Sequence, residues 1–101
     1  MAPNTPEPTP LRILSGGNLV ASTVEERRKA ALAALSAPCS EAILDLTESE
    51  VVDSLGITLI LGLYKTCQQR HLPFRVVGAN PDLMRVFKLF SLPKLFPISE
   101  R

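Results

Sequence analysis

The order of apolar segments predicts an α/β fold, with a mixed or parallel β-sheet of four to five strands and helices packed against it. Short apolar runs of strand character alternate with segments of helical spacing, and the links between them are short. The chain has 101 residues, of which 46% are hydrophobic and 21% are charged. This length and this balance are typical of one globular domain.

The beginning of the chain is rich in proline, with four prolines within residues 1–10. Each proline fixes φ and removes a backbone donor. We therefore expect a flexible N-terminal tail over residues 1–10 and a folded domain over residues 11–101. The domain is expected to begin with a strand over Leu11 to Leu14, followed by a turn at Ser15-Gly16-Gly17. Residues 19–21 are predicted to continue the sheet.

A capping pattern in the sequence indicates where the first helix begins. Ser22 and Thr23 are each followed three residues later by a glutamate, which is a doubled capping-box pattern. We expect the helix to run to about Leu35 and to end before Pro38. Its buried stripe is expected to consist of Val24, Ala31, Leu32 and Leu35.

The middle of the chain contains the most apolar elements. Ala42 to Leu46 is a continuous apolar run, which predicts a central strand covered on both faces. Leu55 to about Arg70 shows a wide helical stripe and is expected to be a largely buried helix. Gly56 and Gly62 are costly inside a helix, so we expect them to allow close approach between the helix and the sheet.

The last third repeats the alternation of strand and helix. Phe74 to Val77 predicts a strand, and Asn80-Pro81-Asp82 combines an N-cap, a proline at the first helical position and an acid in the first turn. The helix is expected to end before Pro93, with Lys94 to Ile98 as a last short strand. Its buried stripe is expected to consist of Leu83, Val86, Phe87 and Phe90.

Charge and hydropathy exclude several classes of function. Eleven basic residues against ten acidic ones leave a net charge of +1, so no broad basic field is available for nucleic acid. No apolar run reaches the roughly 18 residues that span a bilayer, and we expect no direct membrane insertion. Residues 1–10 also lack the pattern of a secretory signal, so the cytoplasm is the expected location.

Catalytic patterns are missing as well. The sequence contains neither a dinucleotide fingerprint nor a phosphate-binding GxxxxGK[ST] loop. Cys39 and Cys67 lack metal-site spacing and are expected to be structural. His71 is expected to interact with a helix C-terminus, and Glu48, Glu50 and Asp53 to be solvated loop acids. We therefore expect no enzyme activity, no cofactor and no metal.

Ser54 is the one residue for which the sequence predicts a chemical role. It follows the central strand and stands at the start of a helix, where free N–H groups and the positive end of the helix dipole favour an added phosphate. The simpler interpretation is that Asp53 or Ser54 only caps the helix. The two roles are compatible.

The motifs around Ser54 resemble a known family. The segments in question are Leu44-Asp45-Leu46, Val52-Asp53-Ser54-Leu55-Gly56, Leu61-Gly62-Leu63-Tyr64-Lys65 and Asn80-Pro81, followed by Leu89-Phe90. They resemble the STAS domains of bacterial anti-sigma factor antagonists over about residues 11–98. The serine directly after the aspartate of the Asp-Ser-x-Gly segment is the family's phosphoacceptor, and this position here is Ser54.

The resemblance implies a protein that switches partners. In the unphosphorylated form it would capture an anti-sigma factor, and a serine kinase of the GHKL type, often that same anti-sigma factor, would phosphorylate Ser54 and break the complex. A phosphatase would reverse the step. The docking surface that the resemblance implies consists of Asp53, Leu55, Gly56, Ile57, Asn18, Leu19, Val20, Ser22 and Thr23.

Three departures from the family pattern bear on this function. Leu55 follows the acceptor where the family has a small hydroxylated residue, and Gly17-Asn18-Leu19-Val20 replaces the common Gly-Glu-Leu-Asp. Residues 1–10 are also shorter than the family's usual first segment, so an edge strand is expected to be missing or replaced. An open edge would favour pairing of two copies as a homodimer.

A second function remains open at this point. Leu55 and Val20 are also compatible with a small STAS subunit of a lipid-transport ABC system. Such a subunit would bind an ATPase subunit through the same loop and helix without a phosphorylation cycle.

Overall fold

The computed structural model describes residues 8–101, which form a four-stranded parallel sheet with helices packed against it. The prediction of a flexible tail over residues 1–10 falls largely on residues 1–7, which lie outside the described residues. The elements in chain order are β1 Leu11–Leu14, α1 Val24–Leu35, β2 Ala42–Asp45, α2 Ser54–Gln69, β3 Phe74–Ala79, α3 Pro81–Leu89, a short 3-10 turn Leu92–Lys94 and β4 Ile98–Glu100. The predicted α/β alternation is confirmed.

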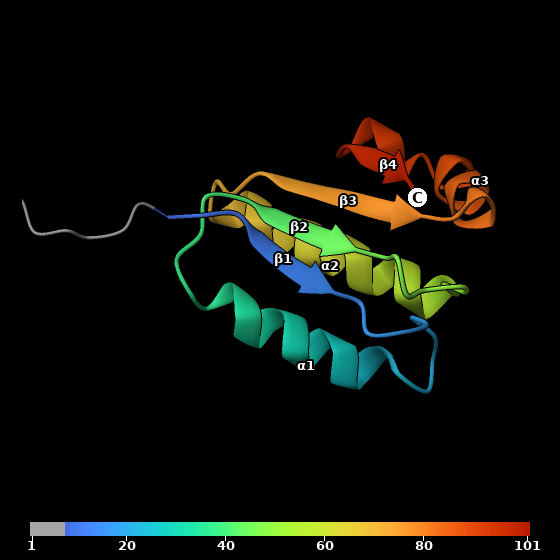
Figure 1. Ribbon diagram of the computed structural model, residues 1–101, viewed down its shortest axis with the longest axis horizontal. Helices are drawn as coiled ribbons and strands as arrows, with labels where there is room; N and C mark the ends of the chain where they lie inside the picture. Colours follow the sequence, from blue (N-terminus) through green and yellow to red (C-terminus); the bar gives the residue numbers. More distant parts are fainter. Residues whose placement is uncertain (1–7) are drawn as a thin grey trace, which may run out of the picture.

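The strands lie in the order β1-β2-β3-β4, so each is hydrogen-bonded to the next in the chain. All three pairs are parallel, with Leu11 opposite Ala42 and Ala42 opposite Phe74. Figure 1 shows α1 and α2 on one side of this sheet, and α3 at the end of β3 beside β4. Because parallel strands need crossover connections, every helix start that follows a strand lies at the same end of the sheet.

The main core lies between the sheet and the two long helices. Alternate strand residues such as Ile13, Leu44 and Val76 point into it, and they meet Ile60 and Leu63 of α2. Ile60, Leu63 and Val76 are each exposed by 1% or less. No helix of residues 8–101 is long and apolar enough to cross a membrane.

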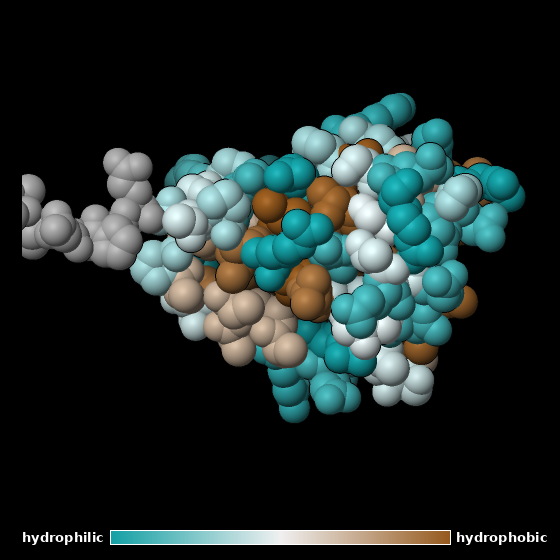
Figure 2. Space-filling model, in the orientation of Figure 1, coloured by the Kyte–Doolittle hydropathy of each residue, from teal (hydrophilic) through white to brown (hydrophobic). Residues whose placement is uncertain are grey.

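The face of the central strands that points away from α1 and α2 is also covered. Ile43 and Asp45 of β2 are buried there by neighbouring side chains rather than by a second layer of helices. Arg12 lies beside Asp45 at 2.7 Å, and Arg75 lies 3.4 Å from Glu41. Figure 2 shows hydrophobic residues on the surface interrupted by hydrophilic ones in this orientation. All four residues of β2 are buried, so the predicted cover of this strand on both faces is confirmed.

The last predicted strand is displaced. Residues 94–97 lie outside any strand, and β4 begins at Ile98 and covers Ile98–Glu100. Two prolines explain the shift, because Pro93 opens the 3-10 turn and Pro97 has no N–H for a ladder. Pro97 contributes its carbonyl, which accepts the Val76 N–H at 2.9 Å.

The third helix begins as predicted and ends earlier. Asn80 caps it by accepting the Leu83 N–H at 2.8 Å. The helix ends at Leu89, and Ser91 adopts a left-handed φ of 59°. Phe90 therefore leaves the apolar stripe and is 55% exposed, contrary to prediction.

The first helix has the predicted bounds but not the predicted cap. Thr23 occupies the N-cap position and makes no side-chain hydrogen bond to the helix. Its hydroxyl donates to the Asn18 carbonyl at 2.7 Å and accepts the Val20 N–H at 3.1 Å. The threonine closes the preceding loop instead of forming a capping box with the glutamate at position 26.

Candidate functional site

Two loops meet at the end of the sheet where the strands finish. Residues 15–23 connect β1 to α1, and residues 46–53 connect β2 to α2. Leu19 and Val52 form a parallel bridge between them. The Leu19 N–H donates to the Val51 carbonyl at 3.1 Å, and the Asp53 N–H donates to the Leu19 carbonyl at 3.1 Å. A single bridge thus continues the pairing at Leu19, as predicted, whereas residues 20 and 21 lie in a bend and a turn and do not continue the sheet, contrary to prediction.

Side chains add further links between these loops. The Asn18 side-chain oxygen accepts the N–H groups of Glu50 and Val51, at 2.8 and 3.0 Å. The buried Ser49 hydroxyl donates to the Gly17 carbonyl at 2.5 Å and lies 2.7 Å from the Ser15 hydroxyl. A serine or asparagine that serves backbone groups of another loop is not distinguishable from a solvated one in the sequence, so the sequence analysis missed this role.

Asp53 has two partners, one for each carboxylate oxygen. Oδ1 accepts the Gly56 N–H at 2.9 Å and caps α2. Oδ2 accepts the Ala21 N–H at 2.9 Å and joins α2 to the other loop. The hydrogen bond from Gly56, with the one from Ala21, holds the pKa of the Asp53 carboxyl below its ordinary value. The expectation that Asp53 caps the helix is confirmed, and its side chain is not merely solvated.

Ser54 is the first residue of α2 and is exposed. Because Asp53 already caps the helix, the Ser54 hydroxyl is not needed for that role. The Ser54 carbonyl accepts the Thr58 hydroxyl at 3.0 Å. The serine side chain therefore stands beside a helix N-terminus, where backbone dipoles favour negative charge.

Gly56 is the closest contact between α2 and the loops. A Cβ atom built on it would lie 2.2 Å from the Leu19 carbonyl oxygen and 2.7 Å from Val52 Cγ1. Real Cβ contacts are longer than about 3.0 Å, so only glycine fits here. The predicted close approach at Gly56 is confirmed, although it is to the bridged loops rather than to a named strand.

Ser54 and the predicted docking residues fall into three groups by burial. Asn18, Ser22, Ser54 and Leu55 are exposed, and Val20, Thr23 and Asp53 are half-buried. Leu19, Gly56 and Ile57 are buried, with exposures of 1% for Leu19 and 4% for Ile57. The buried three lie where the two loops and the helix meet. The exposed surface at Ser54 includes its chain neighbour Leu55 and, next to the Ala21–Asp53 hydrogen bond, Ser22.

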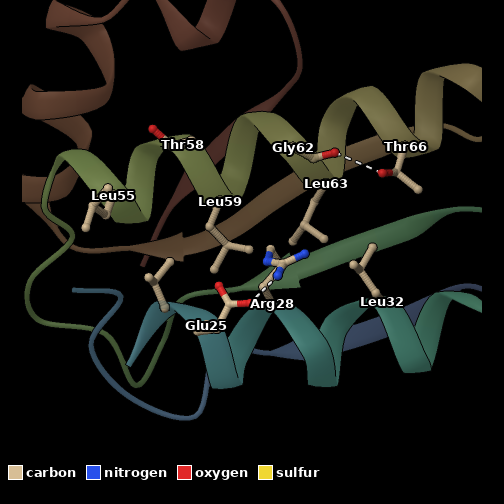
Figure 3. A pocket seen from close by; sticks show the side chains of 10 residues that line it. Glu25, Arg28, Leu32, Leu55, Thr58, Leu59, Gly62, Leu63 and Thr66 are labelled. Carbon is tan, nitrogen blue, oxygen red and sulfur yellow. Dashed lines mark hydrogen bonds and ion pairs between the residues drawn. The ribbon is translucent and has the colours of Figure 1, made fainter. Parts of the chain in front are cut away.

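A groove between α1 and α2 begins beside this surface (Figure 3). Its volume is about 380 Å³. The lining residues are Val24, Glu25, Arg28, Leu32, Leu55, Thr58, Leu59, Gly62, Leu63 and Thr66. Leu55 is 48% exposed and Leu32 is 37% exposed, so the prediction that Leu32 is buried is wrong. The groove was not predicted, because it depends on how far apart the two helices lie.

Gly62 does not have the role that its position suggested. A Cβ atom built on Gly62 would meet nothing within 4 Å. The residue is exposed on α2 and lines the groove. The prediction that it allows close packing on the sheet is therefore wrong.

No group of histidine, cysteine, aspartate and glutamate within residues 8–101 is arranged to hold a metal ion. Cys67 is fully buried in the core, and Cys39 is half-buried. Burial raises the pKa of the Cys67 thiol. The predicted structural burial is therefore confirmed for Cys67, while Cys39 is buried only in part.

The fold and the joined loops define a small parallel α/β domain with an exposed serine at a helix start. The chain belongs to the STAS domain family, whose profile matches residues 4–101. It is 33% identical over 60 residues to an anti-sigma F factor antagonist of Paenibacillus polymyxa, a match that covers 59% of this chain. The match spans about half (51%) of that relative's length.

Solved structures confirm the fold. A candidate anti-sigma factor antagonist from Thermotoga maritima superposes with a TM-score of 0.78 at 21% identity, over 85% of this chain and 74% of the other. A sulfate transporter family protein from Wolinella succinogenes also gives 0.78, at 16% identity, over 91% of this chain and 77% of the other. Identities this low carry the architecture and nothing finer.

Proposed function

We propose that this protein is a regulatory binding module of the anti-sigma factor antagonist type, switched by phosphorylation of Ser54. The observation that carries the proposal is that the residue capping α2 and the exposed hydroxyl at its start belong to two different side chains. Asp53 caps the helix through Oδ1, while Ser54 stands exposed at the first helical position. The similarity to the Paenibacillus antagonist supports the same function.

The switch rests on charge and bulk. A phosphate adds about −1.5 to −2 charges and three acceptor oxygens at one residue. At Ser54 it would lie on the solvent-exposed first residue of α2, at the positive end of the helix dipole, so the folded domain tolerates it. A partner that contacts Leu55 or the loop at Ser22 would meet this group directly. Phosphorylation thus removes partner binding without unfolding the domain.

The proposed partners follow from this function. An anti-sigma factor that is also a serine kinase of the GHKL type would bind the unphosphorylated surface, and a phosphatase would restore it. The protein itself supplies binding and no catalysis, and it acts in the cytoplasm. Nucleic acid is not a partner, since the net charge is only +1.

The test uses purified components. Each GHKL-type kinase encoded in the source genome is mixed with the protein and ATP, and mass spectrometry locates any phosphate. We expect phosphate on Ser54 and on no other residue. Ser54→Ala should bind the same kinase without being modified, and Ser54→Asp should bind at least about ten-fold more weakly, which corresponds to 1.4 kcal/mol.

A matched control places the same charge at the other end of the sheet. Ser40 is exposed in the loop before β2, so Ser40→Asp should bind like the wild type. Equal affinity of the wild type, Ser54→Ala and Ser54→Asp would rule out the switch.

A STAS subunit of a lipid-transport ABC system is the competing function. The 48% exposure of Leu55 favours it, because a large apolar group beside the acceptor suits a permanent contact. This function predicts a stable complex with a transporter ATPase that Ser54→Asp leaves intact. Affinity purification of both forms from solubilised membranes separates the two functions.

A further inference from the structure

The groove between α1 and α2 is apolar and borders the main core, because Leu59 and Leu63 belong to both. Leu59 and Leu63 of α2 and Leu32 of α1 point into the space between the two helices (Figure 3). Leu55 forms the end of the groove beside Ser54. The charged lining residues, Glu25 and Arg28, are paired with each other. An occupant of the groove would therefore meet little unpaired charge.

The ridge of α2 along the groove is made of small residues. Thr58, Gly62 and Thr66 are spaced by four and share one side of the helix. Both threonine hydroxyls donate to carbonyls of their own helix at 3.0 Å, Thr58 to Ser54 and Thr66 to Gly62. Because both hydroxyls already donate within their own helix, covering these threonines leaves no hydroxyl donor without a partner.

Gly62 at the centre of this ridge needs an explanation. Its backbone is ordinary α-helix, its added Cβ would touch nothing within 4 Å, and glycine weakens a helix interior. Neither backbone conformation nor internal packing therefore requires glycine. A glycine on an exposed helix ridge does allow another helix to approach the backbone closely.

We propose that the groove receives an amphipathic helix of the partner protein, whose aliphatic side chains insert beside Leu55 and Leu59 while its backbone crosses α2 at Gly62. This inference rests on the proposed function. It favours the partner over a second copy of this chain because the groove is continuous with the Ser54 surface through Leu55. A helix seated in the groove reaches the phosphate position, so the same event that adds charge at Ser54 displaces it.

The test uses a phage-displayed library of 16-residue amphipathic helices as the probe. Peptides captured by the wild-type protein are compared for binding to Gly62→Leu, which fills the groove and also removes the helix penalty of glycine. We expect captured peptides with aliphatic residues spaced by three and four, and at least ten-fold weaker binding to Gly62→Leu. Methyl resonances of Leu55, Leu59 and Leu63 should shift when a peptide binds.

The matched control is Lys65→Leu. Lys65 is exposed on the same helix and does not line the groove, so this variant adds the same side chain outside it and should bind the peptides like the wild type. Thermal unfolding of both variants at or above the wild-type midpoint excludes a folding defect as the cause. Concentration-dependent sedimentation that Gly62→Leu abolishes would assign the groove to a second copy and overturn the proposal.

Two failures are distinguishable. Capture of no peptide, or of peptides that bind Gly62→Leu and the wild type equally, overturns the groove proposal whatever the kinases do. The proposed switch is overturned if no kinase phosphorylates Ser54 and if Ser54→Asp and the wild type bind the peptides equally. In that case a groove that still discriminates Gly62→Leu serves an unswitched partner.

Discussion

Two glycines of α2 should respond to the same substitution with opposite signs. In Gly56→Ala the new Cβ would lie 2.2 Å from the Leu19 carbonyl oxygen, and this oxygen already accepts the Asp53 N–H. Relief requires the helix start to move away from the bridged loops. Overpacking of this kind costs about 1 to 3 kcal/mol, and a clash with backbone belongs in the upper part of that range. Alanine returns part of the roughly 1 kcal/mol helix penalty of glycine, which leaves a net loss of about 2 kcal/mol.

Gly62→Ala is the matched variant. Its Cβ meets nothing within 4 Å, so the helix gain of up to about 1 kcal/mol is not offset. The two variants should differ by about 3 kcal/mol in the free energy of unfolding. For a domain of this size, that difference places their thermal midpoints more than about 10 °C apart.

Urea unfolding followed by circular dichroism measures both variants against the wild type. A change in midpoint at constant slope reports stability alone. Gly56→Ala at or above the wild-type stability would refute the close approach of α2 to Leu19. A free energy of unfolding for Gly62→Ala that is lower than that of the wild type would refute the open space beside Gly62.

Other groups give two further predictions. Burial raises the pKa of Asp45, but the hydrogen bonds from Thr47 and the adjacent Arg12 guanidinium together outweigh it and leave that pKa below the ordinary 3.8. Asp45 therefore stabilises the fold above that pH, and the urea midpoint should fall as pH drops through 3.8 toward the lower folded-state pKa. Asp45→Asn should flatten this dependence between pH 5 and pH 2, and an unchanged slope would contradict it. Because burial raises the pKa of Cys67, iodoacetamide at pH 8 should modify Cys39 first, as peptide mass spectrometry would show; faster modification of Cys67 would contradict its burial.

The elements with local signals were predicted well. Asn80-Pro81-Asp82 specified the start of α3 through an N-cap and a fixed φ, and the apolar run at Ala42 specified a central strand. The capping box at Thr23 failed because the hydroxyl found closer partners in its own loop. The last strand was misplaced because Leu95 and Phe96 look like strand residues, while Pro97 prevents the ladder there.

The sequence predicted where the candidate site lies along the chain, but not the contacts between distant residues that hold it together. Ser54 and Asp53 follow from the order of strand, acid and helix, which is a local pattern. The buried role of Leu19 depends on a bridge to Val52, more than thirty residues away in the chain. The two glycines read alike in sequence and differ only in what lies opposite them in space. Contacts between separate loops and helices therefore account for most of what the sequence missed.

Asp53 permits a substitution that separates helix capping from loop attachment. Oδ1 serves the Gly56 N–H of its own helix, and Oδ2 serves the Ala21 N–H of the other loop. In Asp53→Asn one oxygen becomes an NH₂ group, which cannot accept a hydrogen bond. Asparagine caps helices about as well as aspartate, so we expect the cap to remain and the bond to Ala21 to be lost.

Amide hydrogen exchange reads both bonds in one experiment. Exchange at Ala21 should accelerate by about ten-fold or more in Asp53→Asn, since this exposed bond opens locally. The Gly56 amide in the same spectrum is the internal control and should stay protected. Equal exchange at Ala21 in both proteins would show that the carboxylate does not hold the loop.

The same variant connects this geometry to the proposed switch. The loop at Ala21 carries Ser22 and Val20, which a partner would contact together with Ser54. If Asp53 holds these residues in place, loss of the bond to Ala21 should slow phosphorylation of Ser54 while the unfolding midpoint changes little. A fall in midpoint without any change in phosphorylation would instead mean that Asp53 acts only as a cap, and that the kinase reads α2 without the neighbouring loop.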